Sequence, residues 1–156
     1  MIEHSNNIYK EYKGIDKGRL DEILSRIGKV KAALIGDLCL DIYWRADMRK
    51  SELSRETPHY NLPVVEEWIS PGAGGNVASN IACVGTEKIF VIGITGRDWR
   101  GDILKDLLSQ SKGVDISGVI TSDTRVGQAF CKPLRKGISH VEYEDPRIDF
   151  LNYTPL

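Results

Sequence analysis

The sequence predicts an α/β fold in which helices cover a parallel sheet. Two nearly unbroken apolar runs, at 30–35 and 88–95, have the length and composition of strands that are buried on both faces. Segments with a helical spacing of apolar residues, at 77–84 and 103–108, alternate with these runs. Such alternation of strand and helix predicts parallel strands joined by crossover connections.

A first helix is predicted directly before the first strand. Asp16 is suited to cap its N-terminus, and Gly28 is suited to end it. Between Leu20 and Ile27, apolar residues recur at i, i+3, i+4 and i+7, which gives one apolar stripe. We therefore separate residues 1–29, a leader and first helix, from the main domain that follows at residues 30–156.

Two carboxylates follow the first strand, at Asp37 and Asp41. A buried strand that delivers carboxylates at its C-terminal end is the usual geometry of an α/β ligand site. A role in a turn or a helix cap is the alternative for either residue. Both are candidates for ligand binding.

The stretch from Pro71 to Ala82 holds three glycines in four residues, followed by Asn76 and an apolar helical pattern. Glycine can take positive φ and lets another molecule approach the backbone closely. We interpret the stretch as a tight turn in which Asn76 caps a buried helix, whose free N–H groups suit oxygen-rich ligands. A simple joint between loop and helix is the alternative, and the glycines alone do not decide between the two.

Segments 43–70 and 127–143 are rich in β-forming residues and lack a helical stripe. Pro63, near the start of an extended run, suits an edge strand. Residues 135–137, Arg-Lys-Gly, suit a short hairpin connection. We expect both segments to form exposed strands that project from the main sheet.

The bulk composition indicates one soluble domain and excludes several classes of partner. The chain has 156 residues, 41% hydrophobic and 28% charged, with a formal net charge of −1. This balance does not suggest nucleic acid, and no apolar run approaches the roughly 20 residues that span a bilayer. The N-terminus lacks a secretion signal and the three cysteines are widely spaced, so we expect free thiols, a cytoplasmic location and no metal site.

Taken together, the order of these motifs resembles the N-terminal half of the ribokinase-like (PfkB) carbohydrate kinases. The resemblance covers roughly residues 30–150. The matching features, in order, are the strand ending in Gly36–Asp41, the projecting β segment, the glycines with Asn76, the strand with Gly93–Asp98, a helix and a returning hairpin. Residues 54–58 and 62–65 look most like the bacterial D-glycero-D-manno-heptose-7-phosphate kinase branch.

The resemblance implies roles for several residues. Asp41 would hydrogen-bond sugar hydroxyls, the glycines would let the sugar lie against the backbone, and Asn76 would contact hydroxyls as well. Arg147 could reach a substrate phosphate, although a surface role is equally open. The candidates for binding a sugar or sugar phosphate are Asp37, Asp41, Gly72, Gly74, Gly75, Asn76 and Arg147. The segments 43–70 and 127–143 would form a lid that excludes water and pairs with a second subunit, so a homodimer is expected.

The sequence departs from this family in two respects. Family members are about twice as long, near the size of a large single domain. Their catalytic aspartate lies in a Gly-Ala-Gly-Asp motif, which this sequence lacks. We therefore assign no catalytic residue and expect a truncated, split or partly sequenced kinase that is inactive alone, with most of the implied ATP and Mg²⁺ site missing. The alternative is a non-catalytic sugar-binding or dimerisation module.

Overall fold

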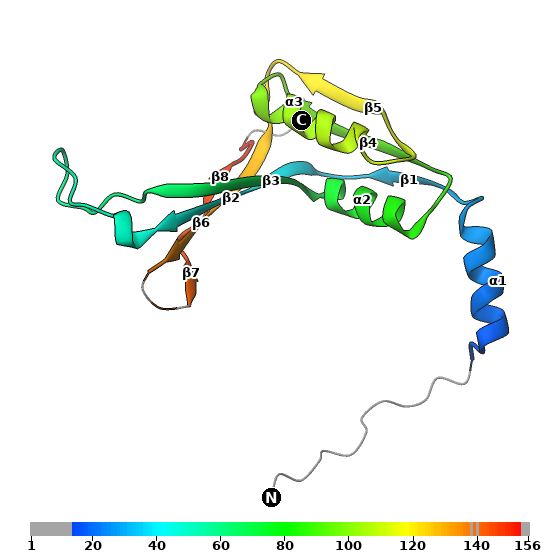
Figure 1. The fold of residues 1–156 in the computed structure, drawn as a ribbon. Coiled ribbons are helices and arrows are strands. Elements are labelled where there is room, and N and C mark those ends of the chain that lie inside the picture. The colour runs from blue at the N-terminus through cyan, green and yellow to red at the C-terminus, as the bar shows by residue number, and fades with distance from the viewer. Residues whose placement is uncertain (1–13, 138, 140, 154–156) are drawn as a thin grey trace, which may run out of the picture.

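Two β-sheets that meet at the base of strand β2 make up the fold (Figure 1). The computed structural model describes residues 14–137, 139 and 141–153. Within them, the first sheet (sheet A) has the strand order β1-β4-β5, and the second (the projecting sheet) has the order β3-β2-β6-β7, with β8 also paired to β6. Ile138 and His140, inside the predicted segment 127–143, lie outside the described residues.

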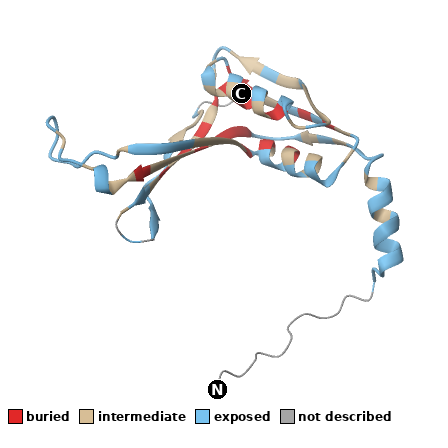
Figure 2. Ribbon diagram, in the orientation of Figure 1, coloured by how far each residue is buried: buried red, intermediate tan, exposed pale blue. Residues whose placement is uncertain are grey.

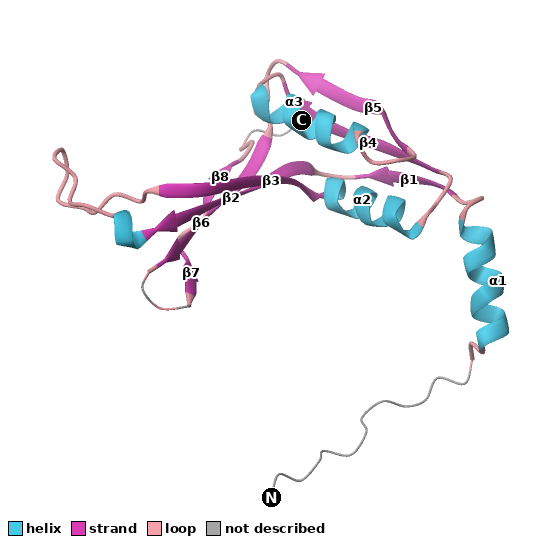
Figure 3. Cartoon of the chain, in the orientation of Figure 1, coloured by secondary structure: helices cyan, strands magenta, loops and turns pink. Residues whose placement is uncertain are grey.

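The elements alternate along the chain as Figure 3 shows. The helices are α1 (Lys17–Ile27), α2 (Gly74–Val84) and α3 (Trp99–Ser109), with a 3₁₀ turn η1 (Met48–Lys50). The strands are β1 (Lys31–Ile35), β2 (Leu38–Asp47), β3 (Val64–Ala73), β4 (Lys88–Gly96), β5 (Val114–Ser122), β6 (Gln128–Lys136), β7 (Glu142–Glu144) and β8 (Ile148–Phe150). No described helix is long and apolar enough to cross a membrane.

Sheet A is parallel throughout, because β4 pairs in parallel with both β1 and β5. One of its faces is covered by α2 and α3. Ile89 and Val91 of β4 are fully buried there and join one cluster with Leu104 and Leu108 of α3. The predicted class, a parallel sheet flanked by helices, is therefore confirmed.

The opposite face of sheet A is apolar, and none of the described helices packs over it. Phe90 and Ile92 alternate with the buried pair on β4, and each is 38% exposed. The register places Ile35 of β1 beside Ile92. Ile120 of β5, which is 61% exposed, lies on the same face of sheet A. Parallel sheets are normally covered on both faces, so this uncovered face is unusual.

Strand β2 links the core to the projecting sheet. Its first half is anchored, with Leu38, Leu40 and Ile42 each no more than 1% exposed, and Figure 2 shows this buried base. Its second half runs outward to Asp47 between β3, which is antiparallel to it, and β6, which is parallel. The antiparallel pairing of β6 with β7 forms a hairpin as predicted, but Arg135 and Lys136, which were expected in its connection, are paired residues of β6.

Helix α1 forms within the predicted bounds and stands apart from the two sheets (Figure 1). The Asp16 carboxylate accepts a hydrogen bond of 2.7 Å from the backbone N–H of Arg19, and Gly28 is the C-cap, as the sequence predicts. Leu20 and Leu24 are 45% and 54% exposed, because nothing described packs against the apolar stripe.

The start of α2 differs from the prediction. Asn76 does not cap this helix, because the helix begins at Gly74 and Ala73 occupies the N-cap position without a side-chain hydrogen bond. There is no separate turn, since β3 runs directly into α2. Ala73 has φ 46° and ψ −125°, a conformation that L-residues with a Cβ rarely adopt.

This geometry makes Ala73→Gly a stabilising substitution. Glycine removes the Cβ that strains this conformation, and we expect the free energy of unfolding to rise by about 1 kcal/mol, a gain partly offset by the greater freedom of glycine in the unfolded chain. Urea denaturation followed by circular dichroism measures the change. Ala78→Gly, in the interior of α2, is the control and should destabilise the protein. A loss of stability in Ala73→Gly would contradict the strained backbone at residue 73.

Candidate functional site

The side chain of Asp41 lies on an outward-facing surface of the projecting sheet. Side chains that alternate along β2 share one face, and the register brings Asp41 beside Phe130 of β6 and Ser70 of β3. One residue pair further out, Tyr43 lies between Lys132 and Trp68. We call this surface the Asp41 face, and define it by Asp41, Tyr43, Trp68, Gly72, Phe130 and Lys132.

Gly72 leaves room for the carboxylate of Asp41. A Cβ at position 72 would lie 2.6 Å from Cys39 Sγ and 3.0 Å from Asp41 Oδ2. Any larger residue would therefore displace these side chains. The glycine serves close approach rather than positive φ, because Gly72 has an ordinary extended backbone within β3.

The other carboxylate oxygen of Asp41 is bound by Lys132. The distance from Lys132 Nζ to Asp41 Oδ1 is 2.8 Å, and Nζ also donates a hydrogen bond of 3.0 Å to the hydroxyl of Tyr43. Both charged side chains are about one-fifth exposed. Burial acts to lower the pKa of Lys132, but the hydrogen bonds with Asp41 and Tyr43 raise it overall, so the ammonium form is maintained.

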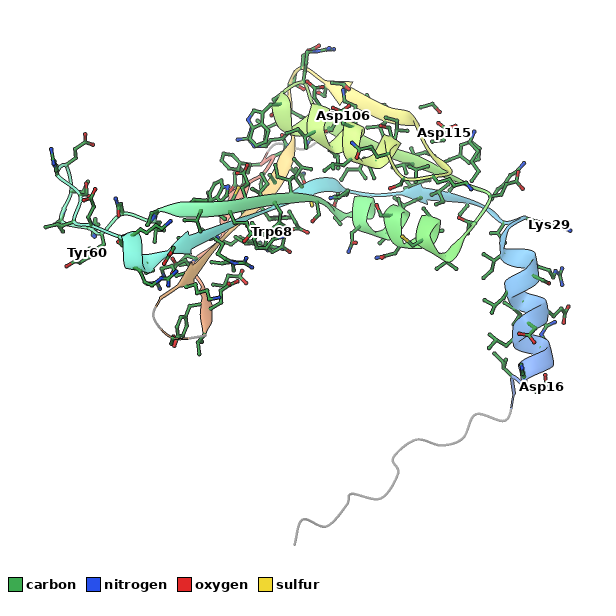
Figure 4. The ribbon with its side chains drawn as sticks, in the orientation of Figure 1. Asp16, Lys29, Tyr60, Trp68, Asp106 and Asp115 are labelled. Atoms are coloured by element: carbon green, nitrogen blue, oxygen red, sulfur yellow. The ribbon has the colours of Figure 1, made fainter. Side chains whose placement is uncertain are left out.

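Aromatic rings form the floor beside this ion pair. The rings of Tyr43 and Trp68 stack in parallel with centroids 4.9 Å apart, and Lys132 Nζ lies 4.7 Å from the Tyr43 centroid. Figure 4 labels Trp68 where it projects from β3. Arg45 covers the other end of this floor, 5.0 Å from the Trp68 centroid, and pairs with Glu66 and Glu142. The stack therefore orients the charged groups around it.

Arg147 reaches the same face from the segment before β8. Its guanidinium lies 4.3 Å from the Phe130 centroid and forms two hydrogen bonds with Asp149, of 2.6 and 2.8 Å. The hydrogen bond with Asp149 raises the pKa of Arg147, and the charge of Asp41 adds to this effect. Arg147 and Asp41 are thus close enough to interact, which the sequence could not show for residues on different strands.

The thiol of Cys39, two residues before Asp41 on β2, is buried next to the Asp41 face. Its pKa is raised to about 11, mainly by burial and also by the carboxylates of Asp41 and Asp37, whereas Lys132 and Arg147 act in the opposite direction. All four charged residues therefore lie within electrostatic range of one sulfur atom. Cys39 stays a neutral, buried thiol at physiological pH.

Asp37 lies at the junction of the two sheets. Its backbone carbonyl accepts a hydrogen bond of 2.9 Å from the N–H of Gly74, and a Cβ at Gly74 would lie 2.8 Å from that oxygen. Asp37 also lines a cavity of about 370 Å³ whose floor includes Ile35, Ile92 and Ile120. Gln128, which pairs with Cys39 across β2 and β6, lines the same cavity and joins it to the Asp41 face.

The remaining two predicted residues lie elsewhere. Gly75 is buried, and a Cβ there would meet Pro71 and the side chains of Leu104 and Leu108, so its smallness allows α2 to approach α3. Asn76 is exposed on α2, where its side-chain oxygen accepts a hydrogen bond of 3.3 Å from Asn80. The structure thus brings Asp37, Asp41, Gly72, Gly74 and Arg147 to one region but packs Gly75 into the core.

Sequence reasoning missed Lys132 and the aromatic floor. The alternation of Gln128, Phe130 and Lys132 along β6 was a signal that these side chains share a face. What it could not supply was the register between β6 and β2. Among the described residues, no group of three or more His, Cys, Asp or Glu side chains could hold a metal ion.

The comparisons with known proteins agree with this architecture. No family model matches the sequence. The bifunctional protein HldE of Geobacter sulfurreducens is 31% identical over 112 residues, which are 71% of this chain and 22% of that relative. HldE of Hydrogenovibrio crunogenus is 32% identical over 127 residues, 81% of this chain and 24% of that relative. The chain spans less than a quarter of the length of these curated relatives.

Similarity to solved structures shows the fold. A carbohydrate kinase from Agrobacterium tumefaciens gives a TM-score of 0.54 at 20% identity, over 74% of this chain and 35% of that one. A second structure from that organism, assigned as a ribokinase, gives 0.56 at 16% identity, over 80% of this chain and 37% of that one. This chain has the ribokinase-like fold. The predicted resemblance to ribokinase-like carbohydrate kinases is confirmed, and the chain is a carbohydrate kinase-like domain.

Proposed function

We propose that this ribokinase-like chain supplies the sugar-binding part of an ATP-dependent carbohydrate kinase, in which a phosphoryl group passes to a sugar hydroxyl. The observation that most supports this is the Asp41 carboxylate, which packs against the backbone of Gly72 and stays about one-fifth exposed on the surface of the projecting sheet. A carboxylate accepts hydrogen bonds from hydroxyl groups, and the missing Cβ of Gly72 lets this carboxylate lie close to the backbone.

The projecting sheet is proposed to act as a lid. It carries the Asp41 face on strands that leave the core, and it borders the cavity through Gln128. A lid matters to a kinase because it excludes water, which competes with the sugar as the phosphoryl acceptor. We also propose that two copies pair through this lid and that the chain functions in the cytoplasm.

The proposed substrate is a sugar or sugar phosphate, with D-glycero-D-manno-heptose 7-phosphate as the first candidate. The similarity to HldE and the motif at 54–58 and 62–65 support this choice. Arg147 would hold the phosphate, since a guanidinium matches its geometry. Asp37 and the backbone at Gly74 complete the proposed set, whereas Gly75 in the core and Asn76 on the surface of α2 are left out of it.

Phosphoryl transfer needs more than this set. Catalysis depends on positioning ATP and the acceptor together and on stabilising charge on the transferred group, and the family's Gly-Ala-Gly-Asp motif does not occur in this sequence. The described carboxylates do not gather into a metal site, so we assign no Mg²⁺ ligand among them. The chain alone is expected to bind sugar without consuming ATP.

Isothermal titration with heptose 7-phosphate and with common hexose 6-phosphates tests the proposal. We expect the wild type to bind at least one of these sugars. Asp41→Asn should weaken that binding by about tenfold to a hundredfold, because a charge-assisted hydrogen bond becomes a neutral one. Asp106→Asn, on the exposed surface of α3, is the matched control and should bind normally.

Two results would contradict the proposal. Absence of binding to every sugar, or equal binding by Asp41→Asn and the control, would remove the Asp41 face as a sugar site. ATP consumption by this chain alone would show that the missing motif is not needed. Assaying released ADP in the presence of each sugar detects such turnover.

A further inference from the structure

The pairing of strands in the projecting sheet does not by itself explain the position of the Lys132 ammonium group on the Asp41 face. A long charged side chain on an exposed strand usually extends into solvent, yet Lys132 is only 19% exposed and folds back over the Tyr43 ring. It ends 2.8 Å from Asp41 Oδ1. Holding a lysine in this position costs side-chain entropy, so the position calls for an explanation.

The donor inventory of Lys132 leaves capacity for a ligand. An ammonium carries three N–H donors, and the described contacts use two of them, to Asp41 Oδ1 and to the Tyr43 hydroxyl. The Tyr43 ring closes one side of the ammonium, because it stacks flat against Trp68. A third donor is therefore available on the surface of the projecting sheet.

Asp41 has a complementary free acceptor. Lys132 binds Oδ1, while Oδ2 packs against Gly72 and accepts no hydrogen bond from the described residues. The ion pair thus offers one acceptor, Asp41 Oδ2, and one donor, Lys132 Nζ. Two hydroxyl groups on adjacent carbons of a sugar ring can donate to the one and accept from the other.

We propose that Lys132 is a specificity-determining residue that, together with Asp41, recognises two adjacent hydroxyl groups of the bound sugar. One hydroxyl donates to Asp41 Oδ2, and the oxygen of its neighbour accepts from Lys132 Nζ. Lys132 also positions Asp41 by holding Oδ1, so the carboxylate does not rotate away. This inference rests on the proposed function, since it requires the Asp41 face to bind sugar.

A substrate phosphate is the other ligand that an ammonium could hold. Asp41 lies directly against Lys132 and balances its charge, whereas the guanidinium of Arg147 lies nearby on Phe130 with five donors and a geometry suited to phosphate. The anionic Asp41 would also repel a phosphate placed on Lys132. The hydroxyl pair is therefore the ligand that the geometry favours.

The test compares, by isothermal titration, the wild type and Lys132→Met with a sugar phosphate and with each of its monodeoxy derivatives. Each derivative gives one cycle of four affinities, formed by two proteins and two sugars. The probes are heptose 7-phosphate or, if it binds better, mannose 6-phosphate, with the 2-, 3- and 4-hydroxyls removed in turn. Methionine keeps the apolar stem over Tyr43 and removes only the ammonium. Thermal unfolding of each variant confirms that it is folded.

We expect Lys132→Met to weaken binding of the parent sugar by about tenfold. For one deoxy derivative, the loss seen with the wild type should disappear in Lys132→Met, because sugar and protein then lack the same hydrogen bond. Lys132→Arg should retain part of the affinity, whereas Lys105→Met on α3, which removes an ammonium paired with Asp102, should change nothing.

The outcomes separate the two proposals. If the wild type binds none of the sugars, the proposed function fails and this inference fails with it. If Asp41→Asn loses affinity but Lys132→Met shows no coupling to any hydroxyl, only the inference is overturned. An affinity loss in Lys132→Met that is confined to phosphorylated probes, and absent with mannose itself, also overturns it, because Lys132 would then hold the phosphate.

Discussion

Replacing Asp98 with alanine is expected to lower the free energy of unfolding by about 3 kcal/mol. One carboxylate oxygen of Asp98 accepts hydrogen bonds from the backbone N–H groups of Arg100 and Gly101, at 3.1 and 3.0 Å, and so caps α3. The other accepts from the N–H of Gly127, at 2.9 Å, immediately before β6. The substitution leaves three backbone donors without this partner at a junction between the two sheets.

Asp102→Ala is the matched control, because Asp102 is also an aspartate in the first turn of α3. Its side chain is 68% exposed and pairs with Lys105 at 3.0 Å, so its loss should cost less than about 1 kcal/mol. Urea denaturation of both variants measures the difference. Equal losses would mean that the contacts of Asp98 do not connect α3 to β6 in solution.

The same residue predicts a dependence on pH. Burial acts to raise the pKa of Asp98, but the hydrogen bonds from Gly101 and Gly127 outweigh it, so the pKa is lowered from its ordinary value of 3.8. A lowered pKa in the folded state gives stability that is complete above the ordinary value and is lost as the pH falls through the lowered one. The stability difference between wild type and Asp98→Asn should therefore shrink below about pH 4.

A pair of isoleucines on β4 gives the second large effect. Ile89 is fully buried against the helices, whereas Ile92 is 38% exposed on the uncovered face of sheet A. Ile89→Ala should cost about 2 to 5 kcal/mol, because it removes buried methyl groups and leaves a cavity. Ile92→Ala should cost about 1 kcal/mol, since much of the side chain already contacts water.

The two variants share residue type, strand and substitution, so their difference measures which face of sheet A is packed. Chemical denaturation with equal m-values gives this difference directly. If Ile92→Ala costs as much as Ile89→Ala, then the face carrying Phe90, Ile92 and Ile120 is covered in solution. Repeating the titration at several protein concentrations then shows whether a second copy provides the cover.

Periodicity predicted the parts of this fold that depend on local sequence. The apolar stripe from Leu20 to Ile27, with Asp16 before it and Gly28 after it, fixed α1, and the apolar run from Lys88 fixed β4. These elements were recognisable because the spacing of apolar residues differs between a helix buried on one side and a strand buried on both. Their parallel arrangement followed from the alternation of strand and helix.

Local sequence is less informative where tertiary contacts override local preference. Gly74 and Gly75 suggested a flexible turn, but they are helical residues whose missing Cβ atoms allow contact with Asp37 and Pro71. The unusual backbone angle falls on Ala73, a residue that propensity alone would never select. Glycine content cannot predict a close approach between segments, because it does not show which other segment approaches the glycine.

The candidate site shows the same limit. Asp41 and Gly72 could be proposed from their motifs, and their sugar-binding roles stay predictions. The pairing of Asp41 with Lys132 joins residues far apart in the chain, and it depends on the register of β2 against β6. A one-residue shift in that register would turn Lys132 to the opposite face, so no reading of either strand alone could reveal the ion pair.

The shape of β2 has a mechanical consequence for the projecting sheet. The strand has 10 residues and a rise of about 3.3 Å each, so it forms an arm about 33 Å long whose first half is buried against the core. A pivot of about 10° at that base displaces the tip by about 6 Å, while Asp41, near the base, moves only a fraction of that distance. A pivot at the base therefore moves the outer part of the sheet much farther than it moves the Asp41 carboxylate.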